Sequence, residues 1–79
     1  MVRIDMEKIS KKQCERFSFM LKQKRIDNKL SRKALSDKLG YSESLIKKWE
    51  TLEVHPNLYN VEDVATYFNL PLNILIGEE

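Results

Sequence analysis

The sequence is poor in residues that form covalent or metal cross-links. Its 79 residues include one cysteine, Cys14, and one histidine, His55. A single cysteine cannot form a disulfide within the chain, so we expect a hydrophobic core to do the stabilising, which fits a reducing cytoplasm. One histidine and one distant cysteine are too few ligands for a metal site. We therefore expect no cofactor, with Cys14 in the core and His55 on a surface loop.

Glycine and long apolar runs are also scarce. The only glycines are Gly40 and Gly77, which excludes a glycine-rich loop that cradles phosphates. No apolar run approaches membrane-spanning length, and the opening "MVRIDMEKISKK" lacks the apolar stretch of a signal peptide. No histidine that could act as a base lies close to Cys14 in the sequence, and no catalytic constellation is evident. We expect a cytosolic protein that is not an enzyme, has no small-molecule substrate and does not insert into membranes.

Lysine and arginine are absent from residues 51–79, which contain five acidic residues. Residues 1–50 contain all fourteen basic residues and seven acidic ones, a net charge of +7, so the whole chain carries +2. This asymmetry suggests that the first part contacts an anionic partner, of which nucleic acid is the common example. The alternative is that these charges are simply scattered over a solvated surface.

Helix caps and apolar spacing predict five helices and no long strand. Ser10 and Gln13 form a capping-box pattern, which predicts a helix that continues to about Asp27. Cys14 and Phe17 begin its apolar face, which continues to Leu21. We expect residues 1–9 to be a flexible N-terminal arm and residues 10–79 to form one domain.

The other four helices have equally clear starts. Ser31 and Ser42 are cap candidates on either side of Gly40, which is suited to end the helix between them. Asn57 caps the fourth helix, and Pro71 starts a short fifth one that ends at Gly77. Two short helices joined by a tight turn, the second rich in lysine, are the layout of a helix-turn-helix.

The motifs that carry this layout are "LSRKAL" and "KLGYSESLIKKWE", with "LKQKR" before them and "NLYNVEDVA" and "NLPLNIL" after them. In these motifs the chain resembles the phage repressor and Cro-like helix-turn-helix family, also called the xenobiotic response element type. The resemblance extends from about Phe17 to Ile76. It implies an all-α, five-helix, lambda-repressor-like DNA-binding domain.

The resemblance also implies roles for individual residues. Arg25 and Glu50 match a partly buried ion pair between the first and third helices, and Trp49 is expected in the core because of its spacing with Leu45 and Ile46. Lys47 and Lys48 have an alternative interpretation as a solvated helix face. The implied base-contacting residues are Glu43, Ser44 and Lys48, and the implied backbone-contacting residues are Ser31, Arg32 and Lys47.

The chain departs from the family pattern in three places. Leu52 stands where glycine usually follows the third helix, so we expect that helix end to differ. The next loop contains Glu53, Val54 and His55 instead of basic residues, which argues against phosphate contacts there. Glu43 replaces the usual glutamine; a carboxylate can accept from cytosine N4, and it also suits a helix N-terminus.

Together these observations predict a sequence-specific regulator of transcription that binds double-stranded DNA as a homodimer, and we expect it to be a repressor that acts at an operator. The fifth helix is more apolar than one core face requires, and its Leu72, Ile74 and Ile76 are the predicted dimer contacts. The N-terminal arm is a second possibility. The alternative function is an antitoxin or other interaction module whose acidic, apolar C-terminal part binds a protein partner.

Overall fold

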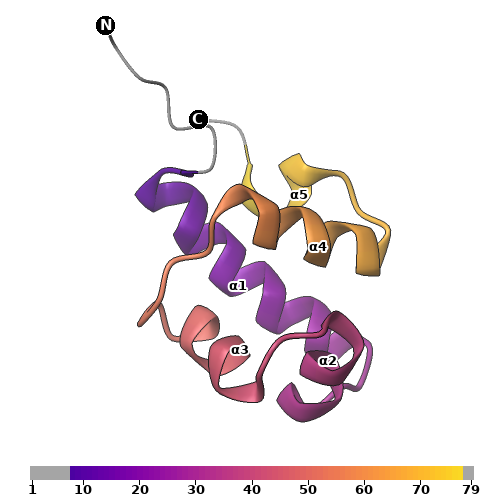
Figure 1. Ribbon diagram of the computed structural model, residues 1–79. Helices are drawn as coiled ribbons and strands as arrows, with labels where there is room; N and C mark the ends of the chain where they lie inside the picture. The colour runs from indigo at the N-terminus through magenta and orange to yellow at the C-terminus, as the bar shows by residue number, and fades with distance from the viewer. Residues whose placement is uncertain (1–7, 78–79) are drawn as a thin grey trace, which may run out of the picture.

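Five α-helices make up most of residues 8–77, the part of the chain that the computed structural model describes (Figure 1). They are α1 (Lys11–Asp27), α2 (Arg32–Leu39), α3 (Glu43–Glu50), α4 (Leu58–Phe68) and α5 (Leu72–Ile76). No strand occurs within residues 8–77, so the predicted all-α fold is confirmed. Residues 1–7 of the predicted arm lie outside the described residues, and Ile9 packs against the core.

Each of the first four helices begins at the predicted cap. In each case the cap side chain accepts a hydrogen bond from the backbone N–H three residues later, at 2.9–3.1 Å. The four caps are Ser10, Ser31, Ser42 and Asn57. Such a cap contributes about 1 kcal/mol to stability, because it satisfies a backbone donor that the helix leaves open. The boundaries of these helices therefore follow from local side-chain chemistry.

Each of the five helices is followed within two residues by a residue with positive φ, and only two of these five residues, Gly40 and Gly77, are glycines. Gly40 ends α2 with φ +82, as predicted. Leu52 follows α3 with φ +65, and its neighbour Glu53 donates its backbone N–H to the carbonyl of Lys48 at 2.9 Å. This is the hydrogen bond of a glycine-type helix end. The expectation of a different end is therefore wrong, because Leu52 takes up the strained conformation itself.

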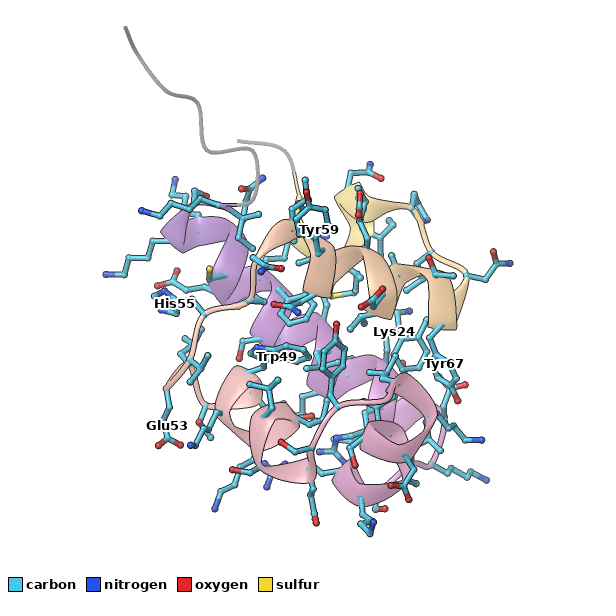
Figure 2. The ribbon with its side chains drawn as sticks, in the orientation of Figure 1. Lys24, Trp49, Glu53, His55, Tyr59 and Tyr67 are labelled. Carbon is cyan, nitrogen blue, oxygen red and sulfur yellow. The ribbon has the colours of Figure 1, made fainter. Side chains whose placement is uncertain are left out.

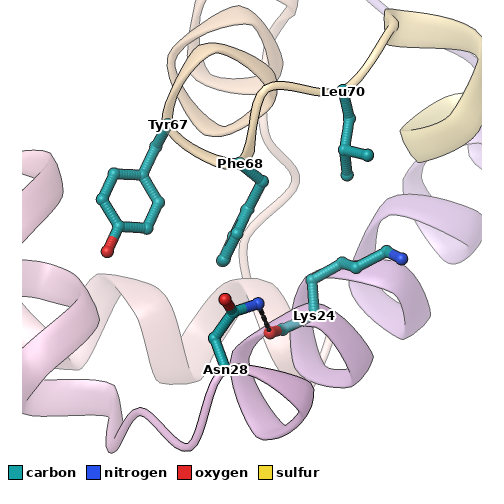
Figure 3. A pocket seen from close by; sticks show the side chains of 5 residues that line it. All are labelled: Lys24, Asn28, Tyr67, Phe68 and Leu70. Carbon is teal, nitrogen blue, oxygen red and sulfur yellow. Dashed lines mark hydrogen bonds between the residues drawn. The ribbon is translucent and has the colours of Figure 1, made fainter.

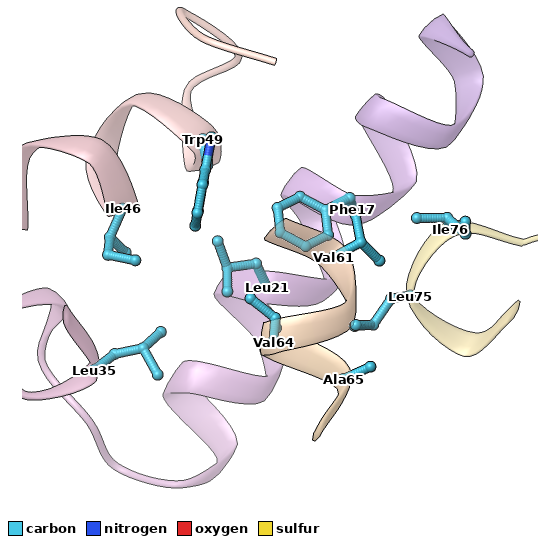
Figure 4. Packing of buried hydrophobic residues seen from close by; sticks show 10 residues of the cluster. All are labelled: Phe17, Leu21, Leu35, Ile46, Trp49, Val61, Val64, Ala65, Leu75 and Ile76. Atoms are coloured by element: carbon cyan, nitrogen blue, oxygen red, sulfur yellow. The ribbon is translucent and has the colours of Figure 1, made fainter. Parts of the chain in front are cut away.

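The core forms where α1 packs against α3, α4 and α5, with α2 packed on α3 and α4 (Figures 1 and 4). Phe17 and Leu21 of α1 are fully buried, and the Trp49 ring meets the Phe17 ring edge-on with centroids 5.8 Å apart. Cys14 is also buried, as expected. The remaining core residues come from α2 to α5: Leu35, Ile46, Val61, Val64, Ala65, Leu75 and Ile76.

Tyr41, in the turn between α2 and α3, ties this turn to α4. Its hydroxyl donates to the Asp63 carboxylate and accepts from the Asn60 amide at 3.2 Å. Its ring packs edge-on against Trp49, with centroids 5.1 Å apart. Burial is the main cause that raises the pKa of Tyr41 above its usual value, and the hydrogen bond to Asp63 raises this pKa further. The turn is thus held from outside as well as by its own backbone.

Candidate nucleic-acid interface

The helix-turn-helix consists of α2, the turn at residues 40–42, and α3. The backbone N–H groups of Gly40 and Tyr41 both donate to the carbonyl of Ser36, at 2.9 and 3.1 Å. A Cβ on Gly40 would meet nothing within 4 Å, so backbone conformation and not space requires glycine here. Leu35 of α2 and Ile46 of α3 are both fully buried. Packing and turn geometry therefore fix the second helix against the first.

The two faces of α3 differ sharply. Ile46 and Trp49 point into the core, as Figure 2 shows for Trp49. The opposite face carries exposed side chains that form no hydrogen bond or ion pair with any part of residues 8–77: Glu43, Ser44, Lys47 and Lys48. These are the four residues of α3 that the sequence analysis assigned to DNA contacts. They form one solvent-facing surface, which we call the outer face of α3.

Arg25 and Glu50, predicted to pair, form a bidentate ion pair between α1 and α3. Arg25 Nε lies 2.7 Å from Glu50 Oε2, and Arg25 Nη2 lies 3.1 Å from Glu50 Oε1. Arg25 Nη1 also donates to the carbonyl of Leu30 at 2.9 Å. The Glu50 side chain is 1% exposed, so its charge depends on this pairing.

Arg32, predicted to contact a phosphate, binds this carboxylate within the protein. Arg32 Nε lies 3.0 Å from Glu50 Oε1, which makes Glu50 the meeting point of α1, α2 and α3. Sequence reasoning missed this contact, because 18 residues separate Arg32 from Glu50 and no periodicity links them. Ser18 adds a further link, donating its hydroxyl to the Glu50 carbonyl at 2.7 Å. The two arginines and one carboxylate together carry a net charge of +1.

The surroundings of the outer face are mixed in charge. Lys33 of α2 pairs with Asp37 at 3.2 Å, and both side chains are well exposed. After α3, the hydroxyl of Thr51 donates to the Glu53 carboxylate at 2.9 Å. Glu53 and His55 extend from this loop away from the core (Figure 2). The basic side chains near the outer face therefore come from α2 and α3, whereas the following loop supplies none.

The three predicted dimer contacts on α5 have different surroundings. Leu72 and Ile74 are half-buried. Ile76 is only 9% exposed and belongs to the core. We therefore remove Ile76 from the predicted dimer surface, because its side chain already packs inside its own chain. The Ile74 carbonyl accepts a hydrogen bond from Arg16 Nε at 3.1 Å, which ties α5 to α1.

A hollow of about 350 Å³ lies between the ends of α1 and α4, and outside the helix-turn-helix (Figure 3). Its lining consists of Lys24, Asn28, Tyr67, Phe68 and Leu70.

Within residues 8–77 no group of three or more acidic, histidine or cysteine side chains is arranged to hold a metal ion. In the same range, no helix has the length and apolar composition needed to cross a bilayer. Burial raises the pKa of the Cys14 thiol, which disfavours the reactive thiolate.

Comparison with known proteins found a matching family and a similar solved structure. The profile of the family described as helix-turn-helix matches residues 21–75. The solution structure of the SOS-response transcriptional repressor LexA from Eubacterium rectale superposes with a TM-score of 0.75 and 22% sequence identity, over 91% of this chain and 77% of that one. At this identity the likeness concerns the fold. No curated protein sequence gives a significant match.

Proposed function

This chain belongs to the helix-turn-helix family, and we propose that it is a sequence-specific repressor that acts at an operator. The family match supports a DNA-binding regulator of transcription. The single observation that carries the proposal is the outer face of α3, where four polar or charged side chains are exposed and unpaired within residues 8–77. A helix that presents such side chains fits the major groove, where each base pair offers a distinct set of donors and acceptors.

In this proposal Glu43, Ser44 and Lys48 contact bases. Lysine at position 48 donates to O6 or N7 of guanine, and the carboxylate of Glu43 accepts from N4 of cytosine. Lys47 lies beside them and contacts the DNA backbone. Because none of these side chains is engaged elsewhere in residues 8–77, binding breaks no internal hydrogen bond.

The N-terminal end of α2 contacts a phosphate. Ser31 caps the helix, and the next backbone N–H groups have no partner inside the helix. An anion is favoured at this position by the unpaired donors and by the helix dipole. Arg32, whose side chain is 32% exposed, adds a full positive charge. Phosphate contacts of this kind fix the register of a protein on DNA, while base contacts select the sequence.

The repressor acts as a homodimer, with two recognition helices about 34 Å apart, one turn of DNA. Leu72 and Ile74 are the remaining candidates for the contact, since both are half-buried in the single chain. Ile74→Asp puts a charge into that contact and should shift the protein toward monomer in sedimentation. Dimerisation at unchanged strength would move the contact to another surface, with the N-terminal arm as the next candidate.

The experiment that tests the function is selection of bound sequences from a random duplex library, followed by affinity measurements at several salt concentrations. We expect one enriched motif, and log K should fall linearly with log salt by about 0.9 per phosphate contacted. An unrelated duplex of equal length serves as the control and should bind much more weakly. Failure to enrich any motif, or an affinity that does not change with salt, would contradict the proposal.

A second candidate function is binding of a protein partner, as in an antitoxin. It is favoured by the outward side of α4, where Tyr59 is 59% exposed beside exposed Glu62 and Asp63, in a region without lysine or arginine. A basic partner surface would complement it. The two functions are compatible, and pull-down with the product of an adjacent gene, run beside the DNA selection, separates them.

A further inference from the structure

The hydrogen bonds of Glu50 divide its carboxylate unequally between two arginines. Oε2 accepts only from Arg25, whereas Oε1 accepts from both Arg25 and Arg32. Arg25 is engaged through Nε, Nη1 and Nη2 and is 12% exposed. Arg32 is engaged through Nε alone and is 32% exposed. The second arginine is therefore held at one atom and open at the others.

A guanidinium has five N–H donors arranged in a rigid plane. When Nε of Arg32 is bound to Glu50, the orientations open to the plane of the group, and so to its remaining donors, are restricted. Those donors have no partner within residues 8–77. They belong to the first residue of α2, next to the Ser31 cap, where the helix favours an anion.

We propose that Glu50 is a positioning residue for DNA binding: it holds Arg32 so that the free edge of the guanidinium meets a DNA phosphate. This inference rests on the proposed function. It means that the buried Glu50 carboxylate increases the affinity for DNA although it does not contact the phosphate itself. Fixing the side chain before binding lowers the entropy cost of ordering it in the complex.

The change in DNA affinity expected for Glu50→Gln has the opposite sign from the change that net charge alone predicts. Glu50→Gln removes one negative charge from the protein, so charge alone predicts tighter DNA binding. Loss of positioning predicts weaker binding, by about threefold to tenfold, because a neutral amide holds an arginine less firmly than a carboxylate does. Asp37→Asn is the matched control, since it removes the same charge from an exposed pair on α2. It should leave the affinity unchanged or raise it by up to about twofold.

A cycle with Arg32→Ala measures the coupling directly. In the natural protein, Arg32→Ala should weaken binding by about tenfold or more and lower the salt slope by about one. In the Glu50→Gln background the same change should cost much less in both quantities. The folded fraction of every variant is measured by circular dichroism at the assay temperature. The salt slope is then taken on folded protein, so it does not respond to a merely structural role.

Arg32→Lys tests the proposal without changing Glu50. Lysine keeps the charge but lacks the rigid fork, so it cannot be held at one atom while presenting an oriented edge. We expect it to lose most of the affinity that Arg32→Ala loses, whereas full activity of Arg32→Lys would overturn the proposal even if Glu50→Gln failed to fold. Additive losses in the cycle, or Glu50→Gln binding as tightly as Asp37→Asn, would overturn it too. Absence of DNA binding by the natural protein would instead reject the proposed function, and this inference with it.

Discussion

Residues 11–50 and residues 58–76 both contribute to the apolar core, but within residues 8–77 only the first region also contains ion pairs. The first region, α1 to α3, contains every ion pair found within residues 8–77, and two of these meet at Glu50. The second region, α4 and α5, contains no basic residue and contributes Val61, Val64, Leu75 and other apolar side chains to the core. Ion pairs thus orient charged side chains in α1 to α3, and the apolar side chains of α4 and α5 pack against these helices in the core.

The largest effect should come from the apolar region. Leu75→Ala removes a side chain with no solvent exposure from α5 and should lower the free energy of unfolding by about 2–5 kcal/mol, from lost burial and the cavity left behind. Urea denaturation followed by circular dichroism measures it. Tyr59→Ala, at an exposed position of α4, is the control and should change stability by about 0.5 kcal/mol or less. Equal losses at the two positions would show that α5 is not held by apolar packing.

The next effect belongs to the polar region. Arg25→Ala leaves the buried Glu50 carboxylate with Arg32 alone, so we expect a loss of about 3 kcal/mol, the lower end of the range for a broken buried pair. Lys33→Ala breaks an exposed pair with Asp37 and should cost about 0.5 kcal/mol or less. The same denaturation experiment compares them. If the two changes cost the same, the distinction between a buried and an exposed ion pair does not hold in this protein.

A smaller effect, on binding instead of folding, should come from the outer face of α3. Lys48→Ala should cost about 1–3 kcal/mol on the best operator and relax the choice of base at one position. Its stability should stay within about 0.5 kcal/mol of the natural protein, because Lys48 has no side-chain partner within residues 8–77. Binding to a library of operator variants measures both affinity and preference. Lys38→Ala, another exposed lysine but on α2, should leave the base preference unchanged, and an unchanged preference for Lys48→Ala would remove it from the reading positions.

The smallest effect should come from Leu52, in the loop between α3 and α4 that connects the two regions. Leu52 has φ +65, a conformation that costs non-glycine residues about 1–2 kcal/mol. Leu52→Gly removes that strain but raises the conformational entropy of the unfolded chain. The free energy of unfolding should therefore rise by only about 0.5–1 kcal/mol, seen as a higher Tm. Leu52→Ala keeps the strain and should give no gain. A lower Tm for Leu52→Gly would mean that the half-exposed leucine side chain contributes more than its backbone costs.

Local chemistry made most of the fold predictable. Ser10, Ser31, Ser42 and Asn57 cap helices through residues three positions away, and such contacts can be read directly from the sequence. The core positions of α3 followed from helical spacing, whereas the residues of its outer face followed from the family resemblance.

What escaped prediction depends on the packing of distant helices. The contact between Arg32 and Glu50 exists only because α2 and α3 cross near α1. The burial of Ile76 likewise depends on how α5 lies against α1. Leu52 shows a third limit: the backbone geometry of the helix end was kept although the residue type that usually provides it was absent.

The outer face of α3 separates two kinds of evolutionary change. Its four side chains are exposed and form no hydrogen bond or ion pair within residues 8–77, while Ile46, Trp49 and Glu50 on the other side carry the packing and the ion pairs. Substitutions at the exposed positions can therefore accumulate without a loss of stability that selection would remove. Under the proposed function, a gene duplicate of this protein would change its operator through these positions alone, and an engineer can randomise them as a library on an unchanged scaffold.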